Sequence, residues 1–174
     1  MKKNEGFTLI ELLIVVAIIG IIAAIAVPGL LRARMSGNEA SAIGSLRAIN
    51  SGESTYASSC GSGGYAALLA DLVLAPAGST AGFISPDMAT DPTIKSGYTV
   101  TLGGDTGAVA GLAAGAACNN NAAALISAYF ANATPVTVGS SGQRSFATDT
   151  RGTIYFLNTG VAIAAGMAGA SPLQ

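Results

Sequence analysis

A run of apolar residues near the beginning of the chain restricts the possible folds more than any other feature. Residues 12–31 contain no charged side chain, and as a helix they would be apolar on every face. At about 1.5 Å per residue, a helix of this length spans roughly 30 Å, the thickness of the hydrocarbon core of a bilayer. We therefore expect residues 7–31 to form a transmembrane helix rather than the buried core helix of a soluble domain.

Basic residues stand on both sides of this run, so counting charges does not orient it. Lys2 and Lys3 precede it, and Arg32 and Arg34 follow it. The N-terminal segment is very short, which favours its retention in the cytoplasm and export of the rest. The run exceeds the apolar core of about 7–15 residues in a secretory signal, and no Ala-x-Ala-like cleavage site follows. We expect it to remain attached as an anchor.

The composition and the motif content argue against several functions. The chain has 8 basic and 9 acidic residues, a formal net charge of −1, which excludes a strongly basic nucleic-acid binder. It has no histidine, the usual general base at neutral pH and the commonest metal ligand. Gly-x-Ser-x-Gly, Walker and Cys-x-x-Cys motifs are absent from the sequence. Asp87 and Asp91 lack the further acidic ligands of a calcium loop, and we interpret them as solvated turn residues. The sequence thus predicts no enzyme, cofactor or metal site.

Glu11 is the one charged residue inside the apolar stretch 7–31. A carboxylate at the centre of a membrane helix costs about 2.5–3.5 kcal/mol on insertion scales, and less near one end. Two interpretations follow from the residue itself. Glu11 is either an acid tolerated at the membrane interface or a group that requires a partner.

Residues 6–28, which begin Gly-Phe-Thr-Leu-Ile-Glu and end Ala-Val-Pro, closely resemble the N-terminal signature of type IV pilins and the related pseudopilins. A short basic leader precedes them, as in that family. The resemblance implies that a prepilin peptidase cleaves after Gly6 and removes the leader, residues 1–6. It also implies that Phe7 becomes the N-methylated terminus, and that Glu11 pairs with the terminal amine of a neighbouring subunit.

Elementary electrostatics agrees with this implied pairing. A buried ammonium and a buried carboxylate are each costly alone, whereas together they offset part of that cost and fix the axial register of packed helices. Further along, Pro28 removes one helical hydrogen bond and clashes with the preceding turn. We expect a kink or a locally melted turn between Gly20 and Pro28, a stretch that in the resembled filaments can lose helicity on assembly.

Residues 32–59 change from a uniformly apolar to an amphipathic pattern. Apolar residues recur at spacings of four, three and seven at Ala42, Leu46, Ile49 and Tyr56. This period is typical of a helix that packs on its own small domain. Three glycines also lie in the segment, namely Gly37, Gly44 and Gly52. They either allow close approach between helices of a filament or reflect the general glycine richness of the chain.

The remainder of the chain predicts a small antiparallel sheet. Residues 60–96 look like a variable connecting region with a short helical patch at 66–74, and residues 97–174 form the sheet region and tail. Four strand candidates are recognised at residues 98–102, 126–131, 144–148 and 153–157, with a hairpin turn at 149–152. Residues 103–124 are low in complexity and predict a surface loop. The fold class is therefore α+β and pilin-like, with about four strands beside one long helix.

The chain has two cysteines, Cys60 and Cys118. An exported, oxidising location favours a disulfide between them, and two free thiols are the alternative. Closing a loop of this size contributes on the order of 4 kcal/mol in the chain-entropy model. The bond requires the two Cα atoms to lie within about 7 Å of each other, which sequence does not show.

Together, these features indicate a structural subunit of a type IV pilus, used in motility, adhesion, DNA uptake or surface attachment. The expected partners are copies of the chain, a prepilin peptidase and the inner membrane. An assembly ATPase, a platform protein and a secretin act indirectly. The precursor belongs in the inner membrane and the assembled subunit in an extracellular pilus. Two alternatives are a pseudopilin of a type II secretion system and a single-span, membrane-anchored periplasmic binding or sensor protein.

Overall fold

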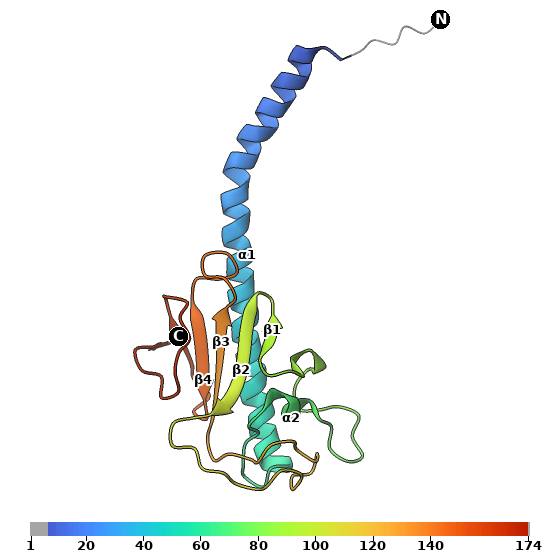
Figure 1. Cartoon of the computed structure of the whole chain (residues 1–174), viewed down its shortest axis with the longest axis vertical. Coiled ribbons are helices and arrows are strands. Elements are labelled where there is room, and N and C mark those ends of the chain that lie inside the picture. Colours follow the sequence, from blue (N-terminus) through green and yellow to red (C-terminus); the bar gives the residue numbers. More distant parts are fainter. Residues whose placement is uncertain (1–6, 174) are drawn as a thin grey trace, which may run out of the picture. The chain divides into compact units, whose positions relative to one another are not determined.

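The computed structural model describes residues 7–173 and combines a long helix with an antiparallel sheet (Figure 1). The helix α1 spans Leu9–Ser59. The described residues fall into two units that divide between Arg34 and Met35, inside α1, and each unit is described by itself. The predicted α+β class, with one long helix and a small sheet, is confirmed.

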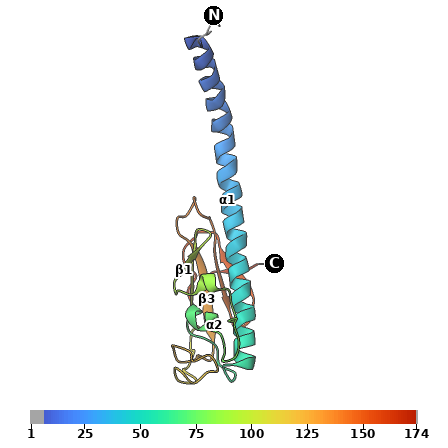
Figure 2. The same ribbon diagram turned by 90° about the vertical axis from the view of Figure 1, so that its right-hand side faces the viewer.

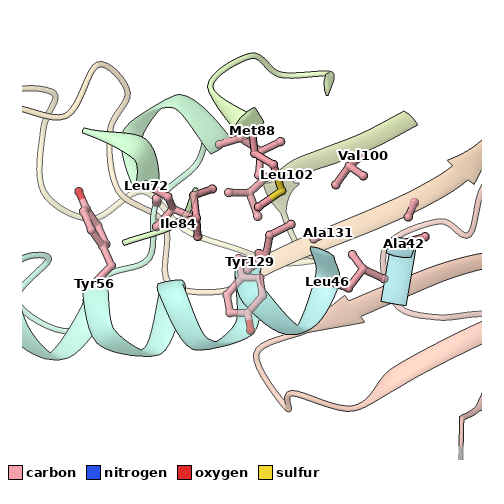
Figure 3. Packing of buried hydrophobic residues seen from close by; sticks show 14 of the residues in the cluster. Ala42, Leu46, Tyr56, Leu72, Ile84, Met88, Val100, Leu102, Tyr129 and Ala131 are labelled. Atoms are coloured by element: carbon pink, nitrogen blue, oxygen red, sulfur yellow. The ribbon is translucent and has the colours of Figure 1, made fainter. Parts of the chain in front are cut away.

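In the second unit, one face of α1 is buried at every turn. Buried positions recur with a period of seven residues at Glu39, Ala42, Leu46, Ile49, Glu53 and Tyr56, and Ser45 and Gly52 beside them are buried as well. This spacing keeps one stripe of the helix facing the sheet, as expected for a surface helix. Figure 3 shows Ala42 and Leu46 directed at the strands, opposite Val100 and Ala131. The predicted stripe is therefore confirmed, with two glutamates added to it.

The sheet is a meander in which every strand pairs antiparallel with the next one in sequence. Its strands are β1 Thr93–Lys95, β2 Tyr98–Gly104, β3 Tyr129–Pro135, β4 Ser145–Asp149, β5 Ile154–Leu157 and β6 Ser171–Pro172. Residues 35–59 of α1 run along one face of this sheet (Figure 2). In β2 the side chains of Tyr98, Val100 and Leu102 are buried, and the residues between them are less so. This alternation places the core between β2 and the helix.

The sheet differs from the prediction in strand number and in one boundary. It has six strands rather than about four. The two that were not predicted, β1 and β6, are three and two residues long and carry no alternating pattern that sequence could reveal. The strand predicted at 126–131 is displaced. β3 begins at Tyr129 and continues to Pro135, since its register is set by pairing with β2 along its whole length. Ile126 instead forms isolated bridges with Tyr65 and Ala110.

The connecting region carries two short helical elements, α2 Leu69–Val73 and the 3-10 turn η1 Pro86–Met88. The helical patch predicted at 66–74 is thus confirmed. A long loop, residues 105–128, links β2 to β3. Most of it is exposed, as expected for a surface loop, but Ala117, Asn119, Asn121 and Leu125 are buried.

Carboxylates attach these irregular segments to the fold through backbone N–H groups. Glu39 Oε1 accepts hydrogen bonds from the N–H groups of Gln143 at 3.0 Å and Arg144 at 3.1 Å. Asp71 accepts from Ala122 at 2.6 Å and Ala123 at 3.2 Å. Asp91 accepts hydrogen bonds from the N–H groups of Leu69 and Leu102, and Glu53 accepts one from the N–H group of Ala66. Acidic side chains therefore hold these segments in place by accepting hydrogen bonds from backbone N–H groups.

A disulfide joins Cys60, which directly follows α1, to Cys118 in the loop 105–128. Their Cα atoms lie 4.9 Å apart, within the range that a bridge requires. The predicted disulfide is confirmed. Beside it, the Tyr56 hydroxyl donates to Asn119 Oδ1 at 3.3 Å, and Asn119 Nδ2 donates to the Asp71 carbonyl at 2.6 Å. The end of α1, the loop and α2 are fastened together at this point.

Candidate functional site

The large apolar side chains of the first unit are exposed to solvent in the single chain. Phe7 is 89% exposed and Ile25 is 76% exposed, and none of the 18 residues of the most apolar helical window is buried. Exposed apolar surface on this scale marks contact with a membrane or with other proteins. By length and composition, this part of α1 is suited to crossing a membrane. A cleaved signal sequence meets the same criterion, so the site's polar residues are needed to decide its role.

Thr8 and Glu11 form a reciprocal pair at the first turn of α1. The Thr8 backbone N–H donates to Glu11 Oε2 at 2.9 Å, and the Thr8 hydroxyl donates to the same oxygen at 2.7 Å. The Glu11 N–H lies 3.3 Å from Thr8 Oγ1. This is a capping box, in which the residue before the helix and the third residue within it satisfy each other's backbone donors. It also puts a carboxylate at the positive end of the helix dipole.

The capping box places the Glu11 carboxylate in a defined position, one turn from Phe7. Both bonds from Thr8 end on Oε2, and Oε1 takes part in neither. Thr8 was not among the residues singled out from the sequence. The pattern Thr-x-x-Glu before an apolar run is a recognised helix-start signal and would have identified it.

The other predicted residues of this segment are found as follows. Gly6, Lys2 and Lys3 lie outside the described residues. Gly20 and Pro28 both lie inside α1, and all residues between them are helical. The single subunit therefore contains the proline within an intact helix, and local melting on assembly stays a prediction.

In the second unit, a hollow of about 220 Å³ lies between α1 and the β4–β5 turn. Its walls are formed by Asn50, Ser54, Tyr65, Tyr129, Thr150, Arg151 and Gly152. Ligand pockets typically measure about 300–1,000 Å³. The Arg151 guanidinium is already engaged, because its Nε donates to Asp149 at 2.8 Å and its Cζ lies 5.4 Å from the centre of the Tyr155 ring. The hollow therefore offers little to a small molecule.

Within residues 7–173, no group of three or more His, Cys, Asp or Glu residues is arranged to hold a metal ion. Asp87 is an exposed acid and pairs with Lys95 at 2.7 Å. Asp91 is not a solvated turn residue as expected, because it is half-buried and bonds to the backbone of Leu69 and Leu102. Burial raises its pKa, and these two N–H groups lower it less than burial raises it.

Comparison with known proteins finds a family motif within the first unit. The prokaryotic N-terminal methylation motif matches residues 1–27. The type IV major pilin protein PilA of Myxococcus xanthus is 44% identical over 54 residues, which are 31% of this chain and 24% of that protein. The type IV wide pilus major component PilA4 of Thermus thermophilus is 59% identical over 39 residues, 22% of this chain and 30% of its own. Over these matched segments the chain is similar to type IV pilins.

A fimbrial protein of Pseudomonas aeruginosa shows how local this family likeness is. It is 79% identical over 28 residues, which are 16% of this chain and 18% of that protein. Across the three relatives, identity falls as the matched segment lengthens, and the chain spans less than a third of the length of each. No solved structure matches the chain. The methylation motif thus includes much of the exposed apolar segment.

Proposed function

We propose that the chain is the structural subunit of a type IV pilus, in which the apolar segments of many copies pack together. The main support for this proposal is that the segment with the methylation motif is also the segment whose large apolar side chains are exposed. Such a surface is unstable in water, and it is covered by lipid before assembly and by neighbouring helices afterwards. The relatives named as pilus components support this role.

In this proposal the precursor is processed before it assembles. A prepilin peptidase removes residues 1–6, and the new amine of Phe7 is methylated. The Glu11 carboxylate then pairs with the Phe7 amine of a neighbouring copy. Thr8 supports the pair by holding Oε2 at the first turn, so that Oε1 is directed to the incoming amine. One stagger between adjacent helices satisfies both charges, which gives the filament its register.

The subunit has no enzymatic role in this proposal, and the work of assembly is supplied elsewhere. The precursor resides in the inner membrane, with its basic leader on the cytoplasmic side, and the assembled form is extracellular. An assembly ATPase, a platform protein and a secretin act on the subunits indirectly. The alternative of a secretion pseudopilin has less support, since the relatives are named as pilus or fimbrial proteins.

Two measurements on the native protein test the proposal. Mass spectrometry of the mature protein is expected to find an N-methylated Phe7 as the first residue. Electron microscopy of sheared surface fibres, with peptide identification, is expected to find fibres made of this chain. A protein that retains residues 1–6 and stays as single copies in the inner membrane would contradict the proposal and support a membrane-anchored module.

The substitution Glu11→Gln tests the charge pair within the fibre. Glutamine can still accept the two bonds from Thr8 but carries no charge, so we expect normal leader removal and a loss of fibres. Thr8→Ser is the matched control, because serine keeps both bonds and the carboxylate, and fibres at the wild-type level are expected. Normal fibre yield from Glu11→Gln would show that the cap, and not the charge, is what assembly requires.

A further inference from the structure

Glu53 is a buried acid in the middle of the second unit, on the stripe of α1 that faces the sheet. Its side chain is completely buried. Oε2 accepts one hydrogen bond, from the Ala66 N–H at 2.9 Å. Oε1 is buried and has no hydrogen-bond partner within residues 7–173. Buried polar atoms are nearly always paired, so this oxygen requires an explanation.

The groups around Glu53 are acidic or phenolic. Asp71 of α2 is fully buried and acts on Glu53 as a like charge. The phenols of Tyr56 and Tyr129 are also electrostatically coupled to it. Both phenols donate their protons elsewhere: Tyr56 to Asn119, and Tyr129 to Asn50 at 3.0 Å.

The remaining neighbours contribute no compensating charge. Tyr65 of the connecting segment stacks edge-on against Tyr129, with ring centres 5.1 Å apart. The two nearby arginines bond to other acids: Arg144, directly before β4, to Glu39, and Arg151, in the turn after β4, to Asp149. Within the described residues, no cation therefore forms an ion pair with Glu53.

An ionised carboxylate in this position is strongly disfavoured, because burial removes its hydration and only the Ala66 N–H replaces part of it. Burial and, to a smaller extent, the charge of Asp71 raise the pKa of Glu53 to about 8, against the lowering effect of the Ala66 N–H. The neutral acid keeps its bond from Ala66 through Oε2 and carries its proton on the oxygen that has no donor. Protonation therefore removes the charge from a buried group to which the described residues offer a single donor.

Glu39 shows that the same helix face accepts an ionised acid when partners are provided. It lies two seven-residue periods before Glu53 and forms an ion pair with Arg144, with 2.7 Å between Oε2 and Nη2. Burial raises its pKa, but the N–H groups of Gln143 and Arg144 and the guanidinium outweigh this and lower it overall. The two acids differ in their partners rather than in their place on the stripe.

We propose that Glu53 is a pH-sensitive contact between α1 and the connecting segment: the folded subunit keeps its carboxyl protonated, and loss of the proton favours opening of residues 60–68 away from the helix, which lets water reach the buried carboxylate. Ala66 lies between two other attachments of this segment: the Tyr65–Ile126 bridge, with N···O distances of 2.9 and 3.0 Å, and the Leu69 N–H, which donates to Asp91 Oδ2 at 3.3 Å. Deprotonation therefore loosens a short stretch between two fixed points. The inference does not depend on fibre formation.

The sign of the pH effect follows from proton linkage. In the unfolded chain Glu53 titrates near the ordinary value of about 4.3, whereas in the folded chain its pKa is about 8. Between these values the folded state holds a proton that the unfolded state has lost. The stabilisation is complete below the unfolded pKa and declines as the pH rises through the folded pKa. One such group raises the unfolding constant about tenfold per pH unit across this interval.

Urea unfolding of the full chain in zwitterionic detergent micelles, followed by the tyrosine signal, tests this sign. All five tyrosines lie in the second unit, so the signal reports on that unit alone. Between pH 5 and pH 8, the unfolding constant of the wild type is expected to rise at least a hundredfold. Glu53→Gln keeps an acceptor for Ala66 without a titrating group, and it is expected to remove most of this rise. The same rise in Glu53→Gln would overturn the proposal.

Glu39→Gln is the matched control, since it removes a buried acid from the same stripe. Because the pKa of Glu39 is lowered, its titration lies below this interval, and the rise between pH 5 and pH 8 is expected to persist in the variant. A rise that disappears equally in both variants would assign the effect to general disruption of the stripe and overturn the role of Glu53.

A direct measurement on the wild type does not depend on any variant folding. The chain has four glutamates, at positions 5, 11, 39 and 53, so selective ¹³C labelling of glutamate carboxyls gives a simple NMR spectrum. We expect one carboxyl to remain protonated at pH 7 and to titrate near pH 8. The amide exchange of Ala66, corrected for its intrinsic pH dependence, is expected to accelerate over the same range. Four carboxyls ionised at pH 7 would overturn the proposal.

Discussion

The two parts of α1 share one helix and differ in how their side chains are used. Before Arg34, leucine, isoleucine and valine occupy every face, and their side chains are exposed in the single chain. After Met35, apolar residues are confined to one stripe, and that stripe is buried against the sheet. The methylation motif lies in the first part, and identity to the relatives is highest over the shortest matched segment. One part is therefore built for contacts with other molecules, and the other for contacts with its own domain.

The largest expected effect contrasts two apolar truncations, one in each part. Leu46 is completely buried, so Leu46→Ala is expected to lower the free energy of unfolding of the second unit by about 2–5 kcal/mol. Ile18 is 52% exposed in the single chain, and Ile18→Ala is expected to change the free energy of unfolding of the second unit by less than about 0.5 kcal/mol. Urea unfolding in micelles measures both. Equal effects would remove the distinction between the two parts.

A smaller effect is expected from the ion pair on the buried stripe. Because the pKa of Glu39 is lowered, its contribution to stability is present above the ordinary pKa and is lost as the pH falls through the folded value. Glu39→Gln is thus expected to cost about 1–3 kcal/mol at pH 7, and progressively less in acid. Asp87→Asn, which breaks the exposed pair with Lys95, serves as the control and is expected to cost less than about 1 kcal/mol. A pH-independent loss in Glu39→Gln would contradict the assignment.

The smallest effect separates the glycines of α1. A Cβ on Gly52 would lie 2.5 Å from Ile84 Cγ2 and 3.1 Å from the Phe83 carbonyl, so Gly52 serves the packing of its own domain. Gly52→Ala is expected to destabilise the second unit. Gly44 faces open space, and Gly44→Ala is expected to stabilise the helix by about 0.5–1 kcal/mol.

Fibre yield from the stabilised Gly44→Ala variant then distinguishes the two interpretations of the exposed glycines. A reduced yield, despite a more stable subunit, indicates that Gly44 lies where another helix approaches closely. An unchanged yield indicates that this glycine reflects composition alone. Gly37, which also faces open space, gives an independent repeat of the same comparison.

Sequence predicted the elements that have a strong local signal. The apolar run, the stripe from Ala42 to Tyr56 and the hairpin around Gly152 all follow from periodicity or turn chemistry, and the structure contains each. Within the stripe, the gap of seven residues between Ile49 and Tyr56 is occupied by the buried Glu53. A hydrophobic pattern does not identify an acid as a core residue, because its burial depends on partners that lie far away in sequence.

The features that sequence missed depend on contacts between distant segments. β1 and β6 are too short for a pattern and exist because β2 and β5 offer free edges to them. β3 runs through Ala-Asn-Ala-Thr-Pro, residues of modest strand propensity, and is defined by its pairing with β2. For the cysteines, the oxidising location predicted a bond, but the 4.9 Å between their Cα atoms is a property of the fold.

The acids that fasten the loops bond to main-chain N–H groups rather than to particular side chains. Every amino acid except proline supplies that group. Positions 122, 123 and 143, which are exposed or half-buried, can therefore exchange their side chains over evolutionary time while the backbone path is inherited unchanged, provided that proline is avoided there. An outer surface of this kind can change its side chains without any change in the fold beneath it.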